Sequence, residues 1–358
     1  MMEPYPTAQT TEDHLQVAAD SLGVDVLLRQ YHSGERDFAG VSLAQADLQG
    51  CHLLDIDLRN ANLTETNFSY CTLHQARLQR ANLSLSILYR CSLSGANLTQ
   101  ANLNGASLIK ADLQKANLSR ADLRESDLTG ANLNYVNLSH ADLTGANLSG
   151  AFLVEADLTG AKLEGAFLKG ACLDGAKLNR ANLERANLSG ASLCNAILDQ
   201  SSFRDSQICH SNLYQATLID ANLGGVNLSG SNLSYAILTG ANLKDADLSG
   251  TFLVATKLDR ACLQCANLSK SQCYQADFMG AAIVGVNWCG ANLHGSNLAD
   301  VSLWITQTSD LLGDFSQTDF SQTESSHRES SPSDAPSDSS SQSPDVRSVD
   351  DFSNPPEH

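Results

Sequence analysis

Residues 96–150 read ANLTQ ANLNG ASLIK ADLQK ANLSR ADLRE SDLTG ANLNY VNLSH ADLTG ANLSG, and this stretch decides the fold. Every fifth residue in it is Leu, and Ala, Ser or Val stands two positions before each Leu. The residue between the two is Asn or Asp in most units. The same frame runs without insertion or deletion from Phe38 to Leu303. A repeat this regular fixes the architecture before any local propensity does.

A period of five fits neither an amphipathic helix nor a flat strand, whose side chains repeat every 3.6 and two residues. The Leu and the small residue are two positions apart, so an extended segment places both on one side. The remaining residues are polar or Gly and can turn the chain before the next inward pair. The pattern therefore predicts a β-solenoid wound around its own column of Leu side chains. Asn and Gly are expected at its corners, because both tolerate unusual backbone angles.

Two further signals indicate 20 residues, or four units, per coil. Cys51, Cys71 and Cys91 are 20 residues apart, each at the small position. With neighbouring strands about 4.8 Å apart, about 13 such coils would form a rod on the order of 65 Å long. Eight glycines also share one phase of a 20-residue period: Gly50, Gly130, Gly150, Gly170, Gly190, Gly230, Gly250 and Gly290.

The A(N/D)LXX units resemble those of the pentapeptide-repeat family over residues 38–303 of 358. The lead-in LLRQYHSGERDFAGVSL, residues 27–43, also resembles the start of cyanobacterial members. The resemblance implies an all-β fold, a right-handed quadrilateral β-helix with the Leu and Ala positions inside. It implies little about function, because one fold can serve unrelated roles.

Composition divides the chain into four segments. Residues 1–37 form an N-terminal segment with short helices expected within 10–33 and with neither the basic flank nor the apolar run of a secretory signal,. Residues 38–303 form the repeat. Residues 304–323 are assigned as a closing segment; they contain DFSQT twice, which is either a degenerate extra turn or low complexity. Residues 324–358 are rich in Ser, Pro and Asp and are expected to be a disordered tail,.

The second expected helix, at 24–33, has apolar residues at helical spacing and is followed by Gly34,. An open end of a solenoid exposes unpaired backbone groups, which a helix can cover. We predict that this helix caps the first coil. A partner-binding helix is the alternative.

No pattern in the sequence predicts catalysis. Cys262 and Cys265 form a CxxC motif, which in isolation suggests zinc or redox chemistry,. In the five-residue frame they flank the inward Leu263, and Cys273 and Cys289 fall on other sides, so tetrahedral coordination would break the coil,. The histidines occupy different repeat positions, and no phosphate loop or nucleophile elbow is present,. We therefore expect no enzyme activity, catalytic residue, metal or cofactor.

The formal net charge of -18 suggests an alternative function. Acidic members of the resembled family act as DNA mimics on the topoisomerase DNA gyrase, which makes a gyrase-binding protein the second hypothesis. The repeat itself, however, has 22 acidic and 18 basic residues, a net charge of only -4. Duplex DNA presents one charge about every 1.7 Å. A mimic would need dense rows of carboxylates, and a nearly balanced repeat argues against them.

The position between the inward pair should face solvent, yet several units place an apolar residue there: Ile87, Phe152, Phe167, Ile197, Ile237 and Phe252. At four units per coil, Phe152 and Phe252 share one side of the rod, and Phe167 lies on the adjacent side near Phe152. Single exposed apolar residues are ordinary, whereas clusters mark contact surfaces. We predict that Phe152, Phe167 and Phe252 form an interaction surface.

The sequence as a whole predicts a cytoplasmic, non-enzymatic scaffold or protein–protein interaction module with an unidentified protein partner. The cysteines form no disulfide framework, which favours a reducing compartment,. No apolar run is long enough to span a membrane,. Direct binding to nucleic acid or membrane is not expected. Homo-oligomerisation through an end of the solenoid stays open.

Overall fold

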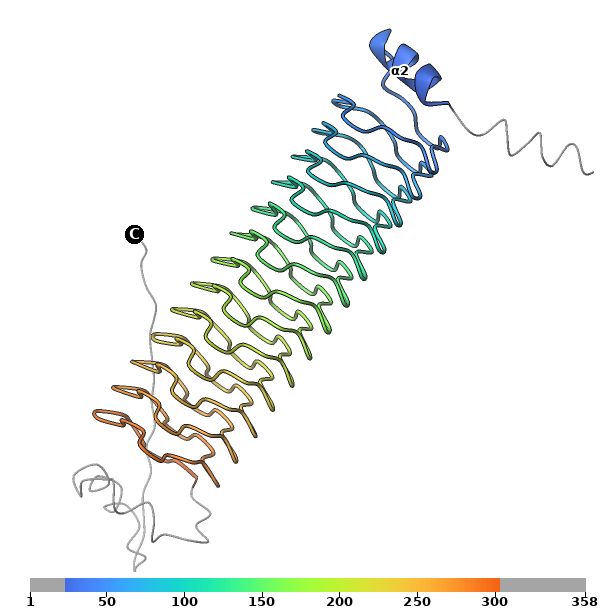
Figure 1. Ribbon diagram of the computed structural model, residues 1–358. Coiled ribbons are helices and arrows are strands. Elements are labelled where there is room, and N and C mark those ends of the chain that lie inside the picture. The colour runs from blue at the N-terminus through green and yellow to red at the C-terminus, as the bar shows by residue number, and fades with distance from the viewer. Residues whose placement is uncertain (1–22, 303–358) are drawn as a thin grey trace, which may run out of the picture. The chain divides into compact units, whose positions relative to one another are not determined.

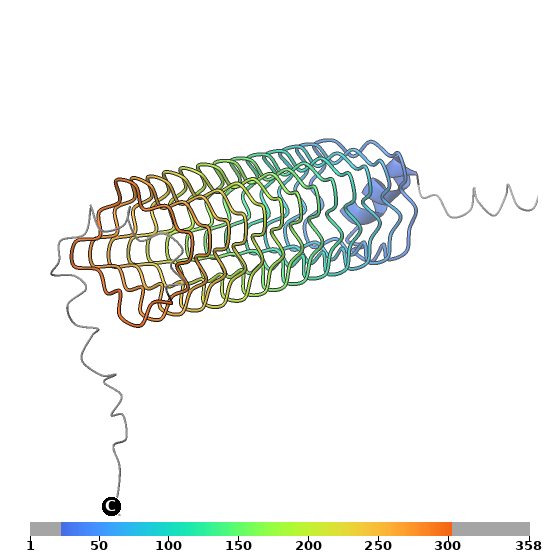
Figure 2. The same cartoon turned by 90° about the horizontal axis from the view of Figure 1, so that it is seen from below.

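The computed structural model describes residues 23–302, which form one helix and a stack of coils (Figure 1). Helix α2 spans Val24–His32. From Asp37 to Ser302 the chain makes single-residue parallel β-bridges between positions 20 residues apart. Figures 1 and 2 show the coils stacked along one axis, with α2 at the N-terminal end. The expected helix within 10–22, the closing segment 304–323 and the tail 324–358 lie outside the described residues.

The bridges form four rows, because a turn separates consecutive bridges every five residues. Rows A, B, C and D begin at residues 37, 42, 47 and 52, and each gains one unit every 20 residues. The chain therefore visits the rows in the order A, B, C, D, and the units of one row lie on top of one another. The predicted 20-residue coil is confirmed.

The interior of the stack is built from the two inward positions of each unit. The central position is buried from Phe38 to Trp288, and the small position from Ile56 to Ala281. Burying one Leu side chain stabilises the fold by about 1.5–3 kcal/mol. Near the C-terminal end of the described coils, Trp288 packs edge-on against Phe278 with ring centroids 5.4 Å apart. The predicted inward column is thus buried from Phe38 to Trp288, and Leu293 and Leu298 beyond it are partly buried.

Backbone hydrogen bonds join each coil to the coils on both sides. In a typical unit, the N–H of Asn62 donates to the preceding coil at 2.8 Å. The N–H groups of Leu63 and Glu65 donate to carbonyls of the following coil at 2.7 and 2.9 Å. The N–H of Thr66 donates to the carbonyl of Leu63 at 3.2 Å and closes the turn. The remaining N–H, on Thr64, donates to Oδ1 of Asn62 at 3.3 Å. Asn or Asp recurs here because its side-chain oxygen accepts the one N–H that the coils leave over.

The expectation of Gly at the corners is confirmed, and Asn60 and Asn195 also stand at corners, but the Asn that recurs in each unit does not. The corner is the second residue after the Leu, and every fifth residue from Gly40 to Asp300 has a positive φ. Many of these residues are not glycine; Arg80 and Lys110, for example, have φ of 58° and 56°. This conformation costs an ordinary residue about 1–2 kcal/mol. It persists because the corner N–H bonds to the next coil, as Arg80 does to Thr99 at 3.0 Å.

Helix α2 packs on the first coil through Leu27 and Tyr31, which are both buried. The Tyr31 hydroxyl donates to the carbonyl of Leu54 at 3.0 Å. The Arg36 guanidinium lies 3.9 Å from the centre of the Tyr31 ring and donates to the Tyr31 carbonyl at 2.8 Å. A cation over an aromatic face adds a stabilising contact. The helix predicted at 24–33 is therefore present, one residue shorter, and it is held by specific bonds.

We predict that Leu138→Lys lowers the melting temperature by many degrees, because Leu138 is fully buried and an isolated cation there is penalised unless its pKa falls. Leu138→Met keeps volume and polarity and should cost less than about 1.5 kcal/mol. Thermal unfolding followed by far-ultraviolet circular dichroism compares the two variants. Equal losses would contradict the inward assignment of this position.

Candidate interaction surface

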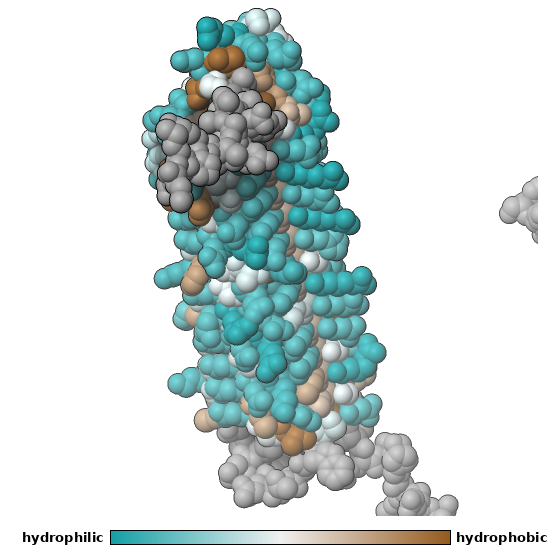
Figure 3. All heavy atoms as spheres, turned by 90° about the vertical axis from the view of Figure 1, so that its right-hand side faces the viewer, coloured by the Kyte–Doolittle hydropathy of each residue, from teal (hydrophilic) through white to brown (hydrophobic). Residues whose placement is uncertain are grey.

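The outer surface of the stack is mainly polar. Hydrophilic side chains cover most of the face seen in Figure 3, and hydrophobic residues there are scattered. In row B, Arg124 pairs with Asp122 at 2.5 Å and Lys162 with Asp142 at 3.2 Å, so cations interrupt the carboxylates. Within residues 23–302, no helix has the length and apolarity to cross a bilayer.

The cysteines are all free. Burial raises the pKa of the Cys71 thiol to about 12 and that of Cys273 to about 11. The two residues of the CxxC motif differ, since Cys262 is half-buried in row B and Cys265 is exposed at the following corner. In the described part of the chain, no group of three or more His, Cys, Asp or Glu is placed to hold a metal ion. The motif is therefore two separate thiols within a regular coil.

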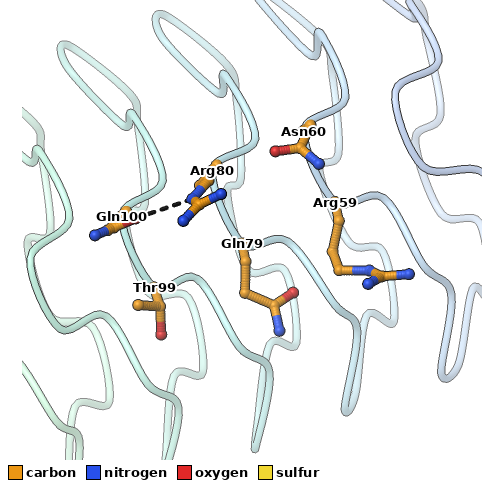
Figure 4. A pocket seen from close by; sticks show the side chains of 6 residues that line it. All are labelled: Arg59, Asn60, Gln79, Arg80, Thr99 and Gln100. Carbon is orange, nitrogen blue, oxygen red and sulfur yellow. Dashed lines mark hydrogen bonds between the residues drawn. The ribbon is translucent and has the colours of Figure 1, made fainter.

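A shallow depression of about 380 Å³ crosses three coils of row A (Figure 4). The Nε of Arg80 donates to Oε1 of Gln100 at 3.0 Å, and the Nε of Arg59 donates to Asp57 at 2.8 Å. The hydrogen bond from Arg59 holds the pKa of Asp57 below its usual range. These contacts already engage both guanidinium groups, and the lining carries no nucleophile beside a general base. The lining residues are Arg59, Asn60, Gln79, Arg80, Thr99 and Gln100.

The three phenylalanines selected from the sequence lie on the outer surface. The exposed fractions of Phe152, Phe167 and Phe252 are 52%, 53% and 50%. Phe152 and Phe252 belong to row D, where five coils separate them, a distance of about 24 Å,. Phe167 belongs to row C and lies one coil beyond Phe152. The structure therefore brings Phe152 and Phe167 near each other and places Phe252 further along the same row as Phe152.

Glycine forms the corner just before the unit of Phe152 and the corner that ends the unit of Phe167. Gly150 and Gly170 end row C units that lead into row D, with φ of 63° and 65°. A Cβ atom at either position would meet nothing within 4 Å, so packing does not require glycine there. Many other corners carry long side chains in the same conformation. At these two coils, the edge between rows C and D carries no corner side chain.

The isoleucines at the same repeat position differ from one another. Ile87 in row C is exposed, whereas Ile197 and Ile237 in row A are only half-buried. Ile237 bridges to Thr217 and Lys257, whose side chains flank it in the row. The expectation that all these apolar residues face solvent is therefore correct for Ile87 and only partly correct in row A.

Row D carries further aromatic residues that the sequence analysis did not select. Tyr135, Tyr235 and Tyr274 are exposed. Tyr235 packs edge-to-face on Tyr214 with ring centroids 5.5 Å apart, and Tyr274 stacks on His294 at 5.6 Å. Both pairs join neighbouring coils of the same row. We call the outward side chains of row D from Tyr135 to His294 the row D surface.

Two sequence signals could have revealed the row D surface. Residues 132–154, NLNYVNLSHADLTGANLSGAFLV, recur 100 positions later as NLSYAILTGANLKDADLSGTFLV. Tyr135 and Phe152 thereby recur as Tyr235 and Phe252, five coils further on. The last six row D units, ASLCN, SNLYQ, SNLSY, TFLVA, SQCYQ and ANLHG, contain no Asp, Glu, Lys or Arg. Enrichment in aromatic residues and depletion of charge distinguish interface cores from other surfaces.

Comparisons with known proteins agree with this architecture. A family model described as "Pentapeptide repeats (8 copies)" matches residues 37–303 in overlapping segments. HetL, a pentapeptide repeat protein involved in heterocyst differentiation regulation from the cyanobacterium Nostoc sp. strain PCC 7120, is 32% identical. That match covers 77% of this chain and 95% of HetL, with a TM-score of 0.24. The family assignment rests on the sequence identity and on the share of each chain that is matched, and the TM-score has no part in it.

Two other solved structures are similar over shorter stretches. A pentapeptide repeat protein of the Arabidopsis thaliana thylakoid lumen is 31% identical over 28% of this chain and 70% of its own, with a TM-score of 0.28. QnrB1, a plasmid-mediated fluoroquinolone resistance protein, is 22% identical over 49% of this chain and 87% of its own, with a TM-score of 0.39. A comparison with curated proteins found no match.

We predict that Cys265 and Cys289, which are exposed, react with a thiol reagent at pH 8 in the folded protein. Cys71 and Cys273 should react only after denaturation. Their pKa values, raised to about 12 and about 11, keep both thiols protonated at that pH, and the thiolate is the reactive form. Mass spectrometry after timed alkylation measures each site. Rapid labelling of Cys71 in the folded protein would contradict the described burial.

Proposed function

The chain belongs to the pentapeptide-repeat family, and from this premise we propose that it is a non-enzymatic scaffold that binds a protein partner. The proposed binding surface is the row D surface together with Phe167 in row C. The observation that carries the proposal is the run of exposed aromatic residues on a row whose last six units have no charged side chain. Aromatic anchors contribute most of the binding energy in many protein interfaces.

The rigidity of the coil stack supports this function. Main-chain bonds to both neighbouring coils hold the position of Phe152, whose N–H donates to the carbonyl of Ala131 at 2.9 Å. A side chain on such a frame loses little backbone freedom when a partner binds, and preorganisation of this kind favours affinity. Phe152 and Phe167 therefore suit a role as fixed anchors.

The alternative function, a DNA mimic that binds DNA gyrase, receives less support. Such a mimic needs continuous rows of carboxylates, whereas Asp122 and Asp142 in row B are paired with cations. The row D surface has almost no charge to imitate phosphate. We therefore rank the scaffold first.

Several finer features belong to the same proposal. We infer that the coil is right-handed and quadrilateral, as the family relationship implies, and that the repeat ends near residue 303. The segments 1–37, 304–323 and 324–358 are proposed as the cap region, the closing segment and the tail. We propose the cytoplasm as the compartment because the thiols are free,. Cell fractionation tests this placement, since one similar structure comes from a thylakoid lumen protein.

We predict that the double variant Phe152→Asn with Phe167→Asn loses a protein partner that the unchanged chain retains from native lysate. Asn is the residue that the repeat itself prefers at this position, so folding should be preserved. Ile87→Asn is the matched control, because it replaces an exposed apolar residue of row C far from Phe167. Quantitative mass spectrometry of the captured proteins gives the readout. A capture profile unchanged in the double variant would refute the proposed surface.

A salt titration separates the two functions. Binding through aromatic residues should survive moderate salt, whereas binding through carboxylates should weaken steeply, because salt screens exposed charges within about 10 Å at 0.1 M. We predict that the full chain does not inhibit the supercoiling activity of gyrase at low salt. Strong, salt-sensitive inhibition would favour the DNA mimic over the scaffold.

A further inference from the structure

We infer that the row D surface pairs with the row D surface of a second copy of this chain, in an antiparallel arrangement. The inference rests on the function proposed above, since it names the partner of that same surface. Three observations carry it: the repeated aromatic cluster, the distribution of charge, and the area that the row offers.

The repeated aromatic cluster suits a two-fold interface. Tyr135 and Phe152 form the first cluster, and Tyr235 and Phe252 form its copy five coils away in the same row. In an interface with two-fold symmetry, a residue i contacts a residue j of the second copy, and j contacts i in return. When Phe152 lies opposite Phe252 of the second copy, the coil of Tyr135 lies opposite the coil of Tyr274. Both residues of the first cluster then face a coil with an exposed aromatic residue.

The charge distribution favours a second copy over an oppositely charged partner. The repeat has a net charge of -4, with 22 acidic and 18 basic residues, so it is not a strongly basic or acidic surface that would select an oppositely charged partner. From Tyr135 to His294, the charged residues of row D are Glu155 and Asp174, and in the antiparallel arrangement their coils face those of Phe252 and Asn232, which have none. Over residues 191–295, row B contains Lys244 and Asp245, and row C contains Asp247 and Lys270. Like charges facing each other disfavour association. Row D is thus the row on which two copies can meet with least repulsion.

The area of the row indicates which size class of interface the two copies would form. Units 131–135 to 291–295 span eight steps between coils, a length of about 38 Å at the spacing of neighbouring strands, and three extended residues give a width of about 10 Å. Each copy therefore contributes about 400 Å², and the interface totals about 800 Å², below the size of standard stable complexes. We expect a weak, reversible dimer, because interfaces of this size belong to transient complexes.

The antiparallel arrangement also fixes which residues face each other. If Phe152 lies opposite Phe252 of the second copy, then Cys172 lies opposite Asn232 of that copy. The reason is that Cys172 is one coil after Phe152, and Asn232 is one coil before Phe252, while the two chains run in opposite directions. Within one chain, Cys172 and Asn232 are three coils apart, about 14 Å. A disulfide needs Cα atoms within about 7 Å. A cysteine placed at 232 can therefore reach Cys172 only in another copy.

The first experiment is sedimentation velocity of the full chain over a range of concentrations. The expected result is a monomer–dimer equilibrium whose dissociation constant rises at least about tenfold in the double variant Phe152→Asn with Phe252→Asn, the change expected for loss of interface anchors. Ile87→Asn, in row C, should leave the equilibrium unchanged. A chain that is monomeric at all concentrations overturns the inference, and so does a dimer that responds equally to the double variant and to Ile87→Asn.

The second experiment tests the register by mild oxidation in a glutathione buffer. Asn232→Cys should give a covalent dimer joined to Cys172, and Cys172→Ser in the same chain should abolish it. Asn132→Cys is the matched control, because Asn132 makes the same kind of bond to the preceding coil, at 2.9 Å to Asp112, as Asn232 makes to Asn212 at 3.2 Å. Equal cross-linking of both variants overturns the antiparallel register.

The two proposals can fail separately. If the chain is monomeric while the Phe152 and Phe167 substitutions still abolish capture of a different protein, the dimer inference is wrong and the scaffold function stands. If the dimer forms as described while capture of other proteins is unaffected by those substitutions, the row D surface serves self-association, and the proposed binding of a different protein through it is wrong.

Discussion

The structure depends on one constraint: each coil must satisfy its backbone hydrogen bonds through the coils on either side. Four of the five N–H groups in a typical unit bond to backbone carbonyls, and the fifth needs a side-chain acceptor, as Thr64 finds in Asn62. Unpaired backbone groups away from water are costly. This requirement keeps the unit at five residues and makes insertions difficult, because a single added residue would displace every later bond. The uninterrupted frame of the sequence is the visible result.

The same constraint explains why an aromatic residue at the middle position is informative. In other units, the Asn at the middle position accepts the N–H of the residue two positions later, as Asn62 does from Thr64. Phe152 has no oxygen that could accept the N–H of Val154. Here the N–H of Val154 donates instead to Oδ1 of Asn134 in the preceding coil, at 2.9 Å. A neighbouring side chain thus compensates for a residue that breaks the local rule. The N–H groups of Cys194 and Ile219 are satisfied in the same way, by Asp174 and Asp199 of the preceding coil.

Much of the fold could be predicted from the sequence because it depends on periodicity alone. The inward column, the 20-residue coil and helix α2 all follow from the spacing of apolar and small residues. The role of Asn could not be derived that way, since side-chain capping of an N–H depends on geometry that the spacing does not contain. Phe152, Phe167 and Phe252 were found because they interrupt the pattern. Tyr135 and Tyr235 were overlooked because they stand at corners, where charged, polar, aromatic and small residues all occur.

The ends and the sides of the rod offer different routes to self-association. At the N-terminal end, α2 buries Leu27 and Tyr31, and the Tyr31 hydroxyl donates to the carbonyl of Leu54, so the helix covers part of the first coil. The sides have no free main-chain edge, since the coils pair with one another along their length. Contact through a side must therefore come from side chains, and a regular rod repeats them at fixed intervals. The recurrence of Tyr135 and Phe152 as Tyr235 and Phe252 places two matching anchors about 24 Å apart on one row,. A lateral contact with two anchors resists rotation as well as separation, which a single exposed phenylalanine cannot achieve.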